Sequence, residues 1–339
     1  MVTKETIDIP QGYSQQPHAM GWRGEQLVCF ENGQQYYPTY DNYPTWRGMG
    51  KNMAYEFGQL FTRAITSPCG YYALIYTNFG TKGLLLQLPN RIIREVNRSY
   101  YYADTYEYPA AFFEYEGRTY LAHCPVNYNC LEFEDVITGE IVSHHIDRDP
   151  TDYFISRLEV SSNGHYLLTN GWHWHPVDVA RYYDIKACME NPLLLDDAKF
   201  IETNTDMDEN DDSTTARESD IEFTSAGFID NNTVLTSAPG KELLWWDMIS
   251  TTITRRIQTD APIGNIIPIN AQYTWDVYEY PKLIDLSTGA VIWQDETIDS
   301  GKQDSSIASN ANPNIVWNKD FFKLAIGGDK KVHVLTLAL

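Results

Sequence analysis

A short hairpin unit recurs along the chain and restricts the fold more than any other feature. The segments "CLEFEDVITGEIV" (130–142) and "PKLIDLSTGAVIW" (281–293) each contain an apolar strand, Asp, two residues, Thr-Gly and a second apolar strand. In such a turn Asp bonds its own backbone and Gly supplies a positive φ. The segment "LLWWDMISTTITRRI" (243–257) keeps the unit without the Gly, and "ARYYDIKAC" (180–188) keeps it with an expanded loop.

The spacing of these units sets the number of repeats. The aspartate serves as a phase marker, and equivalent points occur about every 49 residues, near Asp41, Gln87, Asp135, Asp184, Asp247, Asp285 and Thr336. A strand, a turn and another strand precede most markers, as in "AAFFEYEGRTYLAHC" (110–124). Each unit therefore contains about four short strands, and little of the chain has helical periodicity, which indicates an all-β fold.

Four antiparallel strands repeated about seven times are typical of a β-propeller. We therefore expect residues 1–339 to form a single propeller of seven four-stranded blades, with an acidic loop insertion at about 204–220. Eight blades or two smaller domains fit the spacing less well. The last unit ends after three strands, so residues 4–10 are expected to supply its fourth strand and close the ring without an open sheet edge.

The chain resembles the WD-repeat family of seven-bladed propellers. Trp246-Asp247 reproduces the Trp-Asp dipeptide that ends the third strand of that family's blades, and Tyr183-Asp184 and Ile284-Asp285 are related pairs. The family's Gly-His pair before the first strand is absent; Gly164-His165 falls in a different turn. The resemblance implies a propeller in which one face commonly binds partners.

The blade phase also predicts which loops share a face. In strands a to d of a blade, antiparallel connectivity places the d–a and b–c loops on one face. Four d–a loops contain carboxylates: 97–109, 144–153, 204–220 and 295–313. The b–c loop "NGWHWHP" (170–176) belongs to the same face, so we expect an acidic, aromatic surface there.

The charge of the chain restricts its partners. It has 25 Lys and Arg against 46 Asp and Glu, a net charge of −21 and a pI near 4.6. This excludes binding to nucleic acid and to anionic membranes, which require a basic surface. Carboxylates suit a basic protein or peptide, and Tyr and Trp supply flat contact area and cation–π interactions. The expected partner-binding residues are Tyr100, Tyr101, Tyr102, Asp104, Tyr106, Glu107, Tyr108, Asp147, Asp149, Asp152, Trp172, Trp174, Asp206, Asp208, Glu209, Asp211 and Asp212.

Metal and catalytic motifs are sparse. His173 and His175 have the H-x-H spacing that places two imidazoles on one side of a strand, but Pro176 favours a turn. The segment "DMDENDD" (206–212) imitates a calcium loop but has Asp211 where an EF-hand needs Gly and Arg217 where it needs Glu. We therefore expect no cofactor and no catalytic residues, with His173 and His175 as the candidate metal ligands.

The N-terminal region "MVTKETIDIP" lacks an apolar stretch, and no run approaches the about 18 apolar residues of a membrane span. The five cysteines lack pairing motifs. We expect a cytoplasmic protein with buried, reduced thiols.

Three functions fit these observations. The first is a non-enzymatic propeller that binds a basic protein or peptide through the acidic, aromatic face; one specific form is a neutralising, immunity-type inhibitor of a basic effector. The second is a hydrolase or lyase with a histidine-lined, metal-dependent site at the channel mouth, for which His144, His145, His173 and His175 are the candidates. The third is a structural scaffold in a multiprotein complex.

Overall fold

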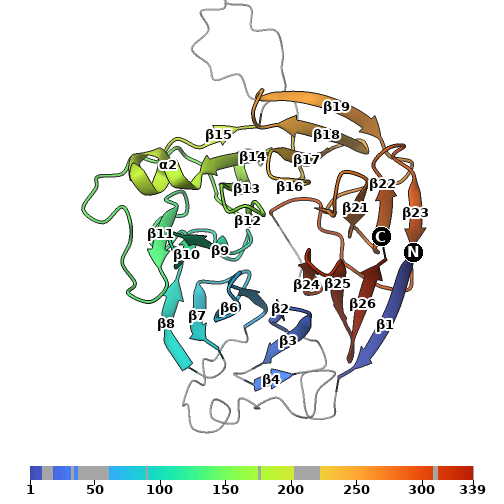
Figure 1. Cartoon of the computed structure of the whole chain (residues 1–339), viewed down its shortest axis with the longest axis horizontal. Coiled ribbons are helices and arrows are strands. Elements are labelled where there is room, and N and C mark those ends of the chain that lie inside the picture. The colour runs from blue at the N-terminus through green and yellow to red at the C-terminus, as the bar shows by residue number, and fades with distance from the viewer. Residues whose placement is uncertain are drawn as a thin grey trace, which may run out of the picture.

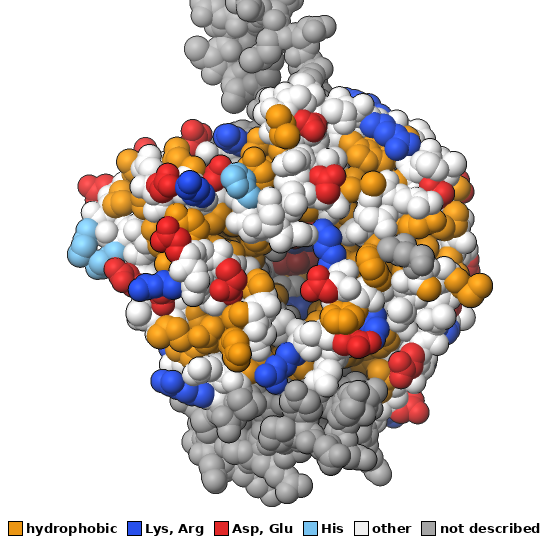
Figure 2. All heavy atoms as spheres, in the orientation of Figure 1, with side chains coloured by type: hydrophobic (Ala, Val, Ile, Leu, Met, Phe, Trp, Pro, Cys, Tyr) orange, Lys and Arg blue, Asp and Glu red, His pale blue; other side chains and the backbone are white. Residues whose placement is uncertain are grey.

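The antiparallel β-sheets of the protein are arranged in a ring (Figure 1). The structure is a computed structural model, and it describes residues 1–9, 18–31, 34–36, 61–88, 91–174, 177–201, 222–307 and 312–338. The face in Figure 2 is hollowed at the centre of the ring, with acidic and basic side chains around the hollow. The expectation of an all-β chain forming a single propeller is confirmed.

Seven sheets are formed by the described residues; six have their strands in chain order, and in the seventh β1 lies beside β26. The first sheet comprises β2 (Met20–Arg23), β3 (Gln26–Glu31) and β4 (Gln34–Tyr36). The second comprises β5 (Arg63–Thr66), β6 (Tyr72–Tyr76), β7 (Lys82–Gln87) and β8 (Arg91–Asn97). The third comprises β9 (Ala110–Tyr115), β10 (Arg118–His123) and β11 (Glu132–Asp135). The next two comprise β12 (Leu158–Val160), β13 (Tyr166–His173), β14 (Val177–Asp184) and β15 (Lys199–Phe200); and β16 (Ser225–Phe228), β17 (Thr233–Ala238), β18 (Glu242–Asp247) and β19 (Thr252–Gln258). The last two comprise β20 (Ile266–Pro268), β21 (Tyr273–Asp276), β22 (Lys282–Asp285) and β23 (Val291–Gln294); and β24 (Ile315–Asn318), β25 (Lys323–Gly328) and β26 (Lys331–Leu337), with β1 (Val2–Asp8).

The aspartate markers end the third strand of their sheets, as the repeat predicts. Asp135, Asp184, Asp247 and Asp285 are the last residues of β11, β14, β18 and β22. The Asp247 carboxylate accepts hydrogen bonds from the backbone N–H groups of Ile249 and Ser250, at 3.1 and 2.7 Å. At Asp184 the expanded loop begins with helix α2 (Ile185–Glu190) and the 3-10 helix η1 (Pro192–Leu195), and Asp184 caps α2 through the N–H of Ala187.

The prediction of seven four-stranded blades is wrong in the number of complete blades. Within the described residues, five sheets have four strands, and a single bridge between Glu134 and Ile141 adds a fourth segment to the β9–β11 sheet. The β2–β4 sheet has three strands, so six blades, not seven, reach four segments. The predicted closure is confirmed, because β1 pairs antiparallel with β26 from Val2↔Leu337 to Asp8↔Lys331; Figure 1 shows the two termini side by side.

Apolar side chains between neighbouring sheets form the core. Phe113 and Phe133 of the β9–β11 sheet pack in one buried cluster with Leu167 and Tyr183 of the β12–β15 sheet. Burial of such side chains contributes roughly 1.5–3 kcal/mol each, which stabilises the contacts between blades. Cys124, Cys130 and Cys188 are buried free thiols, whereas Cys69 is exposed, contrary to expectation. In the part of the chain that the structure describes, no helix has the length and apolarity needed to cross a membrane.

Candidate functional site

Seven aromatic rings gather at one face of the ring, above the β5–β8, β9–β11 and β12–β15 sheets. This aromatic cluster consists of Tyr101, Tyr102, Tyr106, Tyr128, Phe154, Trp172 and Trp174. Its members come from the d–a loops after β8 and β11, from the b–c loop after β10, and from the end of β13 with the turn that follows. Loops of both kinds therefore meet on one face, as the blade phase predicts.

The upper part of the cluster is open to solvent. Tyr101, Tyr102 and Trp174 are 40, 44 and 38% exposed, and the neighbouring Tyr100 is 87% exposed. The ring of Tyr102 lies edge-on to Trp174 at 5.3 Å and to Tyr101 at 4.8 Å. Edge-to-face packing of this kind fixes the rings while leaving flat area for contact.

The lower part of the cluster is buried and supports the rings above it. Phe154 stacks on Trp172, with ring centroids 4.0 Å apart and planes at 9°, and Tyr128 stacks on Phe154 at 4.3 Å. Tyr106 and Trp172 are buried, and so is Tyr108, which lies outside the cluster. As placed, these three predicted partner-binding residues cannot contact a partner.

A buried arginine holds the tyrosine-rich loop in shape. The guanidinium of Arg98 donates to the backbone carbonyls of Gly80 at 2.8 Å, Glu107 at 3.0 Å and Tyr106 at 2.8 Å, and it also donates to the carbonyl of Ala103. Its Cζ lies 4.4 Å from the centroid of the Tyr106 ring. Burial lowers the pKa of Arg98, and the ring of carbonyls supplies the compensation that a buried cation requires.

The charges around the aromatic cluster are arranged by sign. Asp104, Asp147, Asp149 and Asp152 are exposed. Asp152 accepts a hydrogen bond from the Tyr128 hydroxyl at 2.5 Å. The three arginines of the loops after β8 and β11 are buried or paired: Arg98 is buried, Arg148 pairs with Glu132 and Asp196, and Arg157 pairs with Glu107. Among the Asp, Glu, Lys and Arg side chains of the loops after β8 and β11, the exposed ones are therefore all carboxylates.

Glu107 has a different position from the one expected. Its carboxylate pairs with Arg157 at 3.1 Å and accepts a hydrogen bond from Gln303. Residues 299–307, here called the crossing segment, extend from the β20–β23 sheet to these residues: Arg157 also donates to the carbonyl of Ser305 at 2.6 Å. Ile307 forms a bridge with Tyr106 and packs against the aromatic cluster. Glu107 thus fastens the crossing segment to the aromatic face.

The predicted histidine site is not assembled by the described residues. Nδ1 of His173 lies 2.9 Å from the carbonyl oxygen of Asp152, and its Nε2 lies 2.6 Å from a guanidinium nitrogen of Arg181. Since an arginine can only donate, Nε2 accepts and Nδ1 carries the proton. The rings of His144 and His145 lie against each other in an exposed turn, with centroids 3.7 Å apart and planes tilted by 39°. Among the described residues no group of three or more His, Cys, Asp and Glu side chains could hold a metal ion.

Several predicted residues cannot be placed. His175 and the acidic residues Asp206, Asp208, Glu209, Asp211 and Asp212 lie outside the described residues. Sequence reasoning also missed Tyr128, Phe154 and Arg98. Tyr128 was within reach of the blade phase, because it lies in the b–c loop between β10 and β11.

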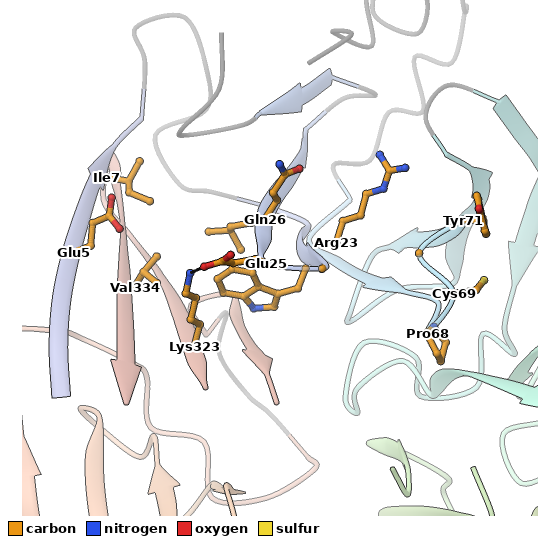
Figure 3. A pocket seen from close by; sticks show the side chains of 14 residues that line it. Glu5, Ile7, Arg23, Glu25, Gln26, Pro68, Cys69, Tyr71, Lys323 and Val334 are labelled. Atoms are coloured by element: carbon orange, nitrogen blue, oxygen red, sulfur yellow. Dashed lines mark hydrogen bonds and ion pairs between the residues drawn. The ribbon is translucent and has the colours of Figure 1, made fainter. Parts of the chain in front are cut away.

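The opposite face has a cavity that is lined by both acidic and basic side chains (Figure 3). Its volume is about 750 Å³, and it lies among the a–b turns that contain Arg23–Gln26 and Pro68–Tyr71. Glu25 and Lys323 point toward one another and form an ion pair of 2.7 Å. Acidic and basic groups are mixed here, so the cavity favours no single class of ligand.

Comparisons with known proteins show the fold and nothing finer. No protein-family model matches the chain, and no curated protein matches it. Among solved structures, it is similar to a chain of an assembly described as "Crystal Structure of Mitotic Checkpoint Complex". That likeness has a TM-score of 0.60 and 10% sequence identity, over 99% of this chain and 94% of that chain. At this identity it shows that the chain has the propeller fold of a solved protein.

Proposed function

We propose that the protein is a non-enzymatic binding propeller that docks a basic protein or peptide through the aromatic cluster and the carboxylates around it. The observation that carries this proposal is the sorting of side chains at one face. Aromatic rings and carboxylates are exposed, whereas Arg98 and Arg148 are turned inward. Water-exposed aromatic area of this density is what binding surfaces use as anchors.

The solved structure that the chain resembles belongs to a protein complex by its printed description. This agrees with a binding role for the present fold, although fold alone does not determine function. A basic partner follows from charge: exposed carboxylates accelerate encounter with a cation-rich surface and pair with it on contact. A basic effector neutralised by this protein is one partner of that kind.

A pair of matched variants tests the proposal. Tyr101→Ala with Trp174→Ala removes two exposed rings of the aromatic cluster. Tyr71→Ala with Phe321→Ala removes two exposed rings from a–b turns at the opposite face, where Tyr71 and Phe321 are 62 and 39% exposed. Each purified variant is immobilised and used to capture proteins from an extract of the source cells.

We expect the wild-type and control proteins to retain a basic partner that elutes as salt is raised, and the aromatic variant to lose it. The activity of the captured protein is then assayed with and without the propeller, and a loss of that activity would show neutralisation. Equal capture by all three proteins, or a captured partner that is acidic, would contradict the proposal.

A further inference from the structure

A second cavity lies on the same face as the aromatic cluster. Its volume is about 600 Å³, and it is bordered by the b–c loops of the β16–β19 and β20–β23 sheets and by the crossing segment. Asp178, Glu222 and Asp304 line it together with the ring of Tyr278 and the side chain of Ile307. We call it the acidic cavity. Binding sites for small groups commonly have volumes of about 300–1,000 Å³, so the acidic cavity has room for more than one side chain.

The charges that line the acidic cavity have one sign. Three of its lining residues are carboxylates, and Lys, Arg and His are absent from its described lining. Asp178 is only 1% exposed; one of its carboxylate oxygens accepts hydrogen bonds from the backbone N–H and the hydroxyl of Ser306, at 3.2 and 2.9 Å. Burial nevertheless raises the pKa of Asp178, while the nearby Arg157 lowers it. A cation in the acidic cavity would further favour the ionised form of this carboxylate.

The acidic cavity adjoins the aromatic cluster through one residue. Ile307 lines the acidic cavity and also packs against Tyr106, Phe154 and Trp172. The backbone at Ile307 is held by its bridge to Tyr106, and the N–H of Glu107 donates to the carbonyl of Ser306. The acidic cavity therefore lies beside the buried floor of the aromatic cluster, and Ile307 is part of both.

We infer that the acidic cavity receives an arginine side chain of the same basic partner, so that the binding surface has an aromatic part and an arginine pocket joined at Ile307. This inference rests on the proposed function. Arginine is favoured over lysine because its planar guanidinium donates to two carboxylates at once and stacks on an aromatic ring such as Tyr278. The two outer carboxylates, Glu222 and Asp304, would pair with the guanidinium, and Asp178 would supply charge from below.

Peptide binding with matched variants tests this inference. The probe is a fluorescein-labelled peptide, Gly-Arg-Gly-Arg-Gly-amide, and its comparison is the same peptide with both arginines replaced by the neutral isostere citrulline. Glu222→Gln with Asp304→Asn removes two charges from the acidic cavity. The control, Glu116→Gln with Asp320→Asn, removes two charges from exposed a–b turns at the opposite face. Affinities are measured by fluorescence anisotropy at about 50 mM salt, where electrostatic contributions are large.

We expect the wild-type protein to bind the arginine peptide at least about tenfold more tightly than the citrulline peptide. The affinity for the arginine peptide should fall at least about fivefold in the cavity variant and less than about twofold in the control. Equal losses in the two variants would show that only net charge matters and would overturn the inference, as would absence of arginine-peptide binding. Asp178→Asn should also lower the affinity for the arginine peptide, and circular dichroism checks that this variant is folded.

The aromatic variant separates this inference from the proposed function. If Tyr101→Ala with Trp174→Ala abolishes partner capture while the cavity variant binds the peptide as wild type does, the proposed function holds and the arginine pocket is wrong. If the cavity variant loses the peptide and the aromatic variant keeps its partner, the arginine pocket holds and the role of the aromatic cluster is wrong.

Discussion

Phe154 and Trp172 are joined by both their main chains and their rings. The N–H of Phe154 donates to the carbonyl of Trp172 at 2.9 Å, the N–H of Trp172 donates back at 3.2 Å, and the rings stack at 4.0 Å. This pair connects the loop after β11 to the end of β13 and forms the floor of the aromatic cluster. The exposed rings of Tyr101 and Trp174 contact the ring of Phe154, so they pack against a floor that main-chain hydrogen bonds hold in place.

Gly171 makes the close approach of these two segments possible. A Cβ at this position would collide with the carbonyl oxygen of Phe154 and lie 2.7 Å from the Tyr153 hydroxyl. We expect Gly171→Ala to destabilise the protein by about 3 kcal/mol, because backbone atoms must move to accept the methyl group. Urea unfolding measures the loss, and near-UV circular dichroism should report unstacking of Trp172. In Gly328→Ala the new Cβ meets nothing closer than 3.6 Å, so a comparable loss in that variant would contradict the explanation.

Arg98 should be required for the shape of the loop that contains Tyr100, Tyr101 and Tyr102. In Arg98→Met the carbonyls of Gly80, Ala103 and Tyr106 lose a buried donor, and each such loss costs about 1–3 kcal/mol. We expect stability to fall by about 3 kcal/mol and limited proteolysis to cut within residues 98–109. Arg91→Met removes an exposed arginine that bonds Gln87 and should leave the proteolytic pattern unchanged. If both variants resisted protease equally, Arg98 would not be the organising residue.

Glu159 gives the protein a specific dependence on pH. It lies on β12, its carboxylate accepts from the N–H of Phe228 at 3.3 Å, and burial raises its pKa from about 4.5 to about 7. The folded protein therefore holds this proton more tightly than the unfolded chain. The corresponding stability is fully present below pH 4.5 and is lost as the pH rises through about 7.

Glu159→Gln should remove this dependence. The free energy of unfolding is measured in urea for the variant and for wild type at pH 5 and at pH 8. We expect the variant's value minus the wild-type value to be about 2 kcal/mol larger at pH 8 than at pH 5. The control Glu116→Gln changes an exposed carboxylate and should follow the wild-type profile. If the difference in unfolding free energy between wild type and Glu159→Gln is the same at pH 5 and at pH 8, Glu159 is not the source of this pH dependence.

The periodic part of the fold was predictable because it depends on local chemistry. Asp135, Asp247 and Asp285 end third strands because the Asp turn is encoded within a few residues, and the counting of turns locates the strands between them. The same phase brought Tyr101 and Trp174 to one face, since loop direction follows from antiparallel connectivity. The completeness of each blade was not predictable: after β11 the fourth segment shrinks to the single bridge of Ile141.

Contacts between distant loops were beyond the reach of the sequence. Periodicity places a loop on a face but does not give the depth of its side chains. From the sequence, Tyr106 and Tyr108 are therefore expected to be exposed, whereas both are buried with their rings against the Arg98 guanidinium. The sequence predicts an acidic loop for the crossing segment, whereas its bonds to Glu107 and Arg157 span 196 and 148 residues of sequence. Such pairings depend on three-dimensional proximity, for which the chain has no local signal.

Asp247 allows the repeat itself to be tested. Its carboxylate accepts hydrogen bonds from the N–H groups of Ile249 and Ser250 and from the Ser250 hydroxyl, and these bonds lower the pKa of Asp247. We expect Asp247→Ala to cost about 1 kcal/mol at pH 7, because the turn after β18 loses its acceptor. A lowered carboxyl pKa contributes stability that is present above the unfolded pKa and is lost as the pH falls through the folded pKa. The cost of the substitution, measured by urea unfolding, should therefore shrink as the pH is lowered from 7 to 3. The control Asp320→Ala lies in an exposed a–b turn and should lower the free energy of unfolding little at either pH. If both variants lose the same stability at pH 7 and at pH 3, Asp247 does not hold the hairpin.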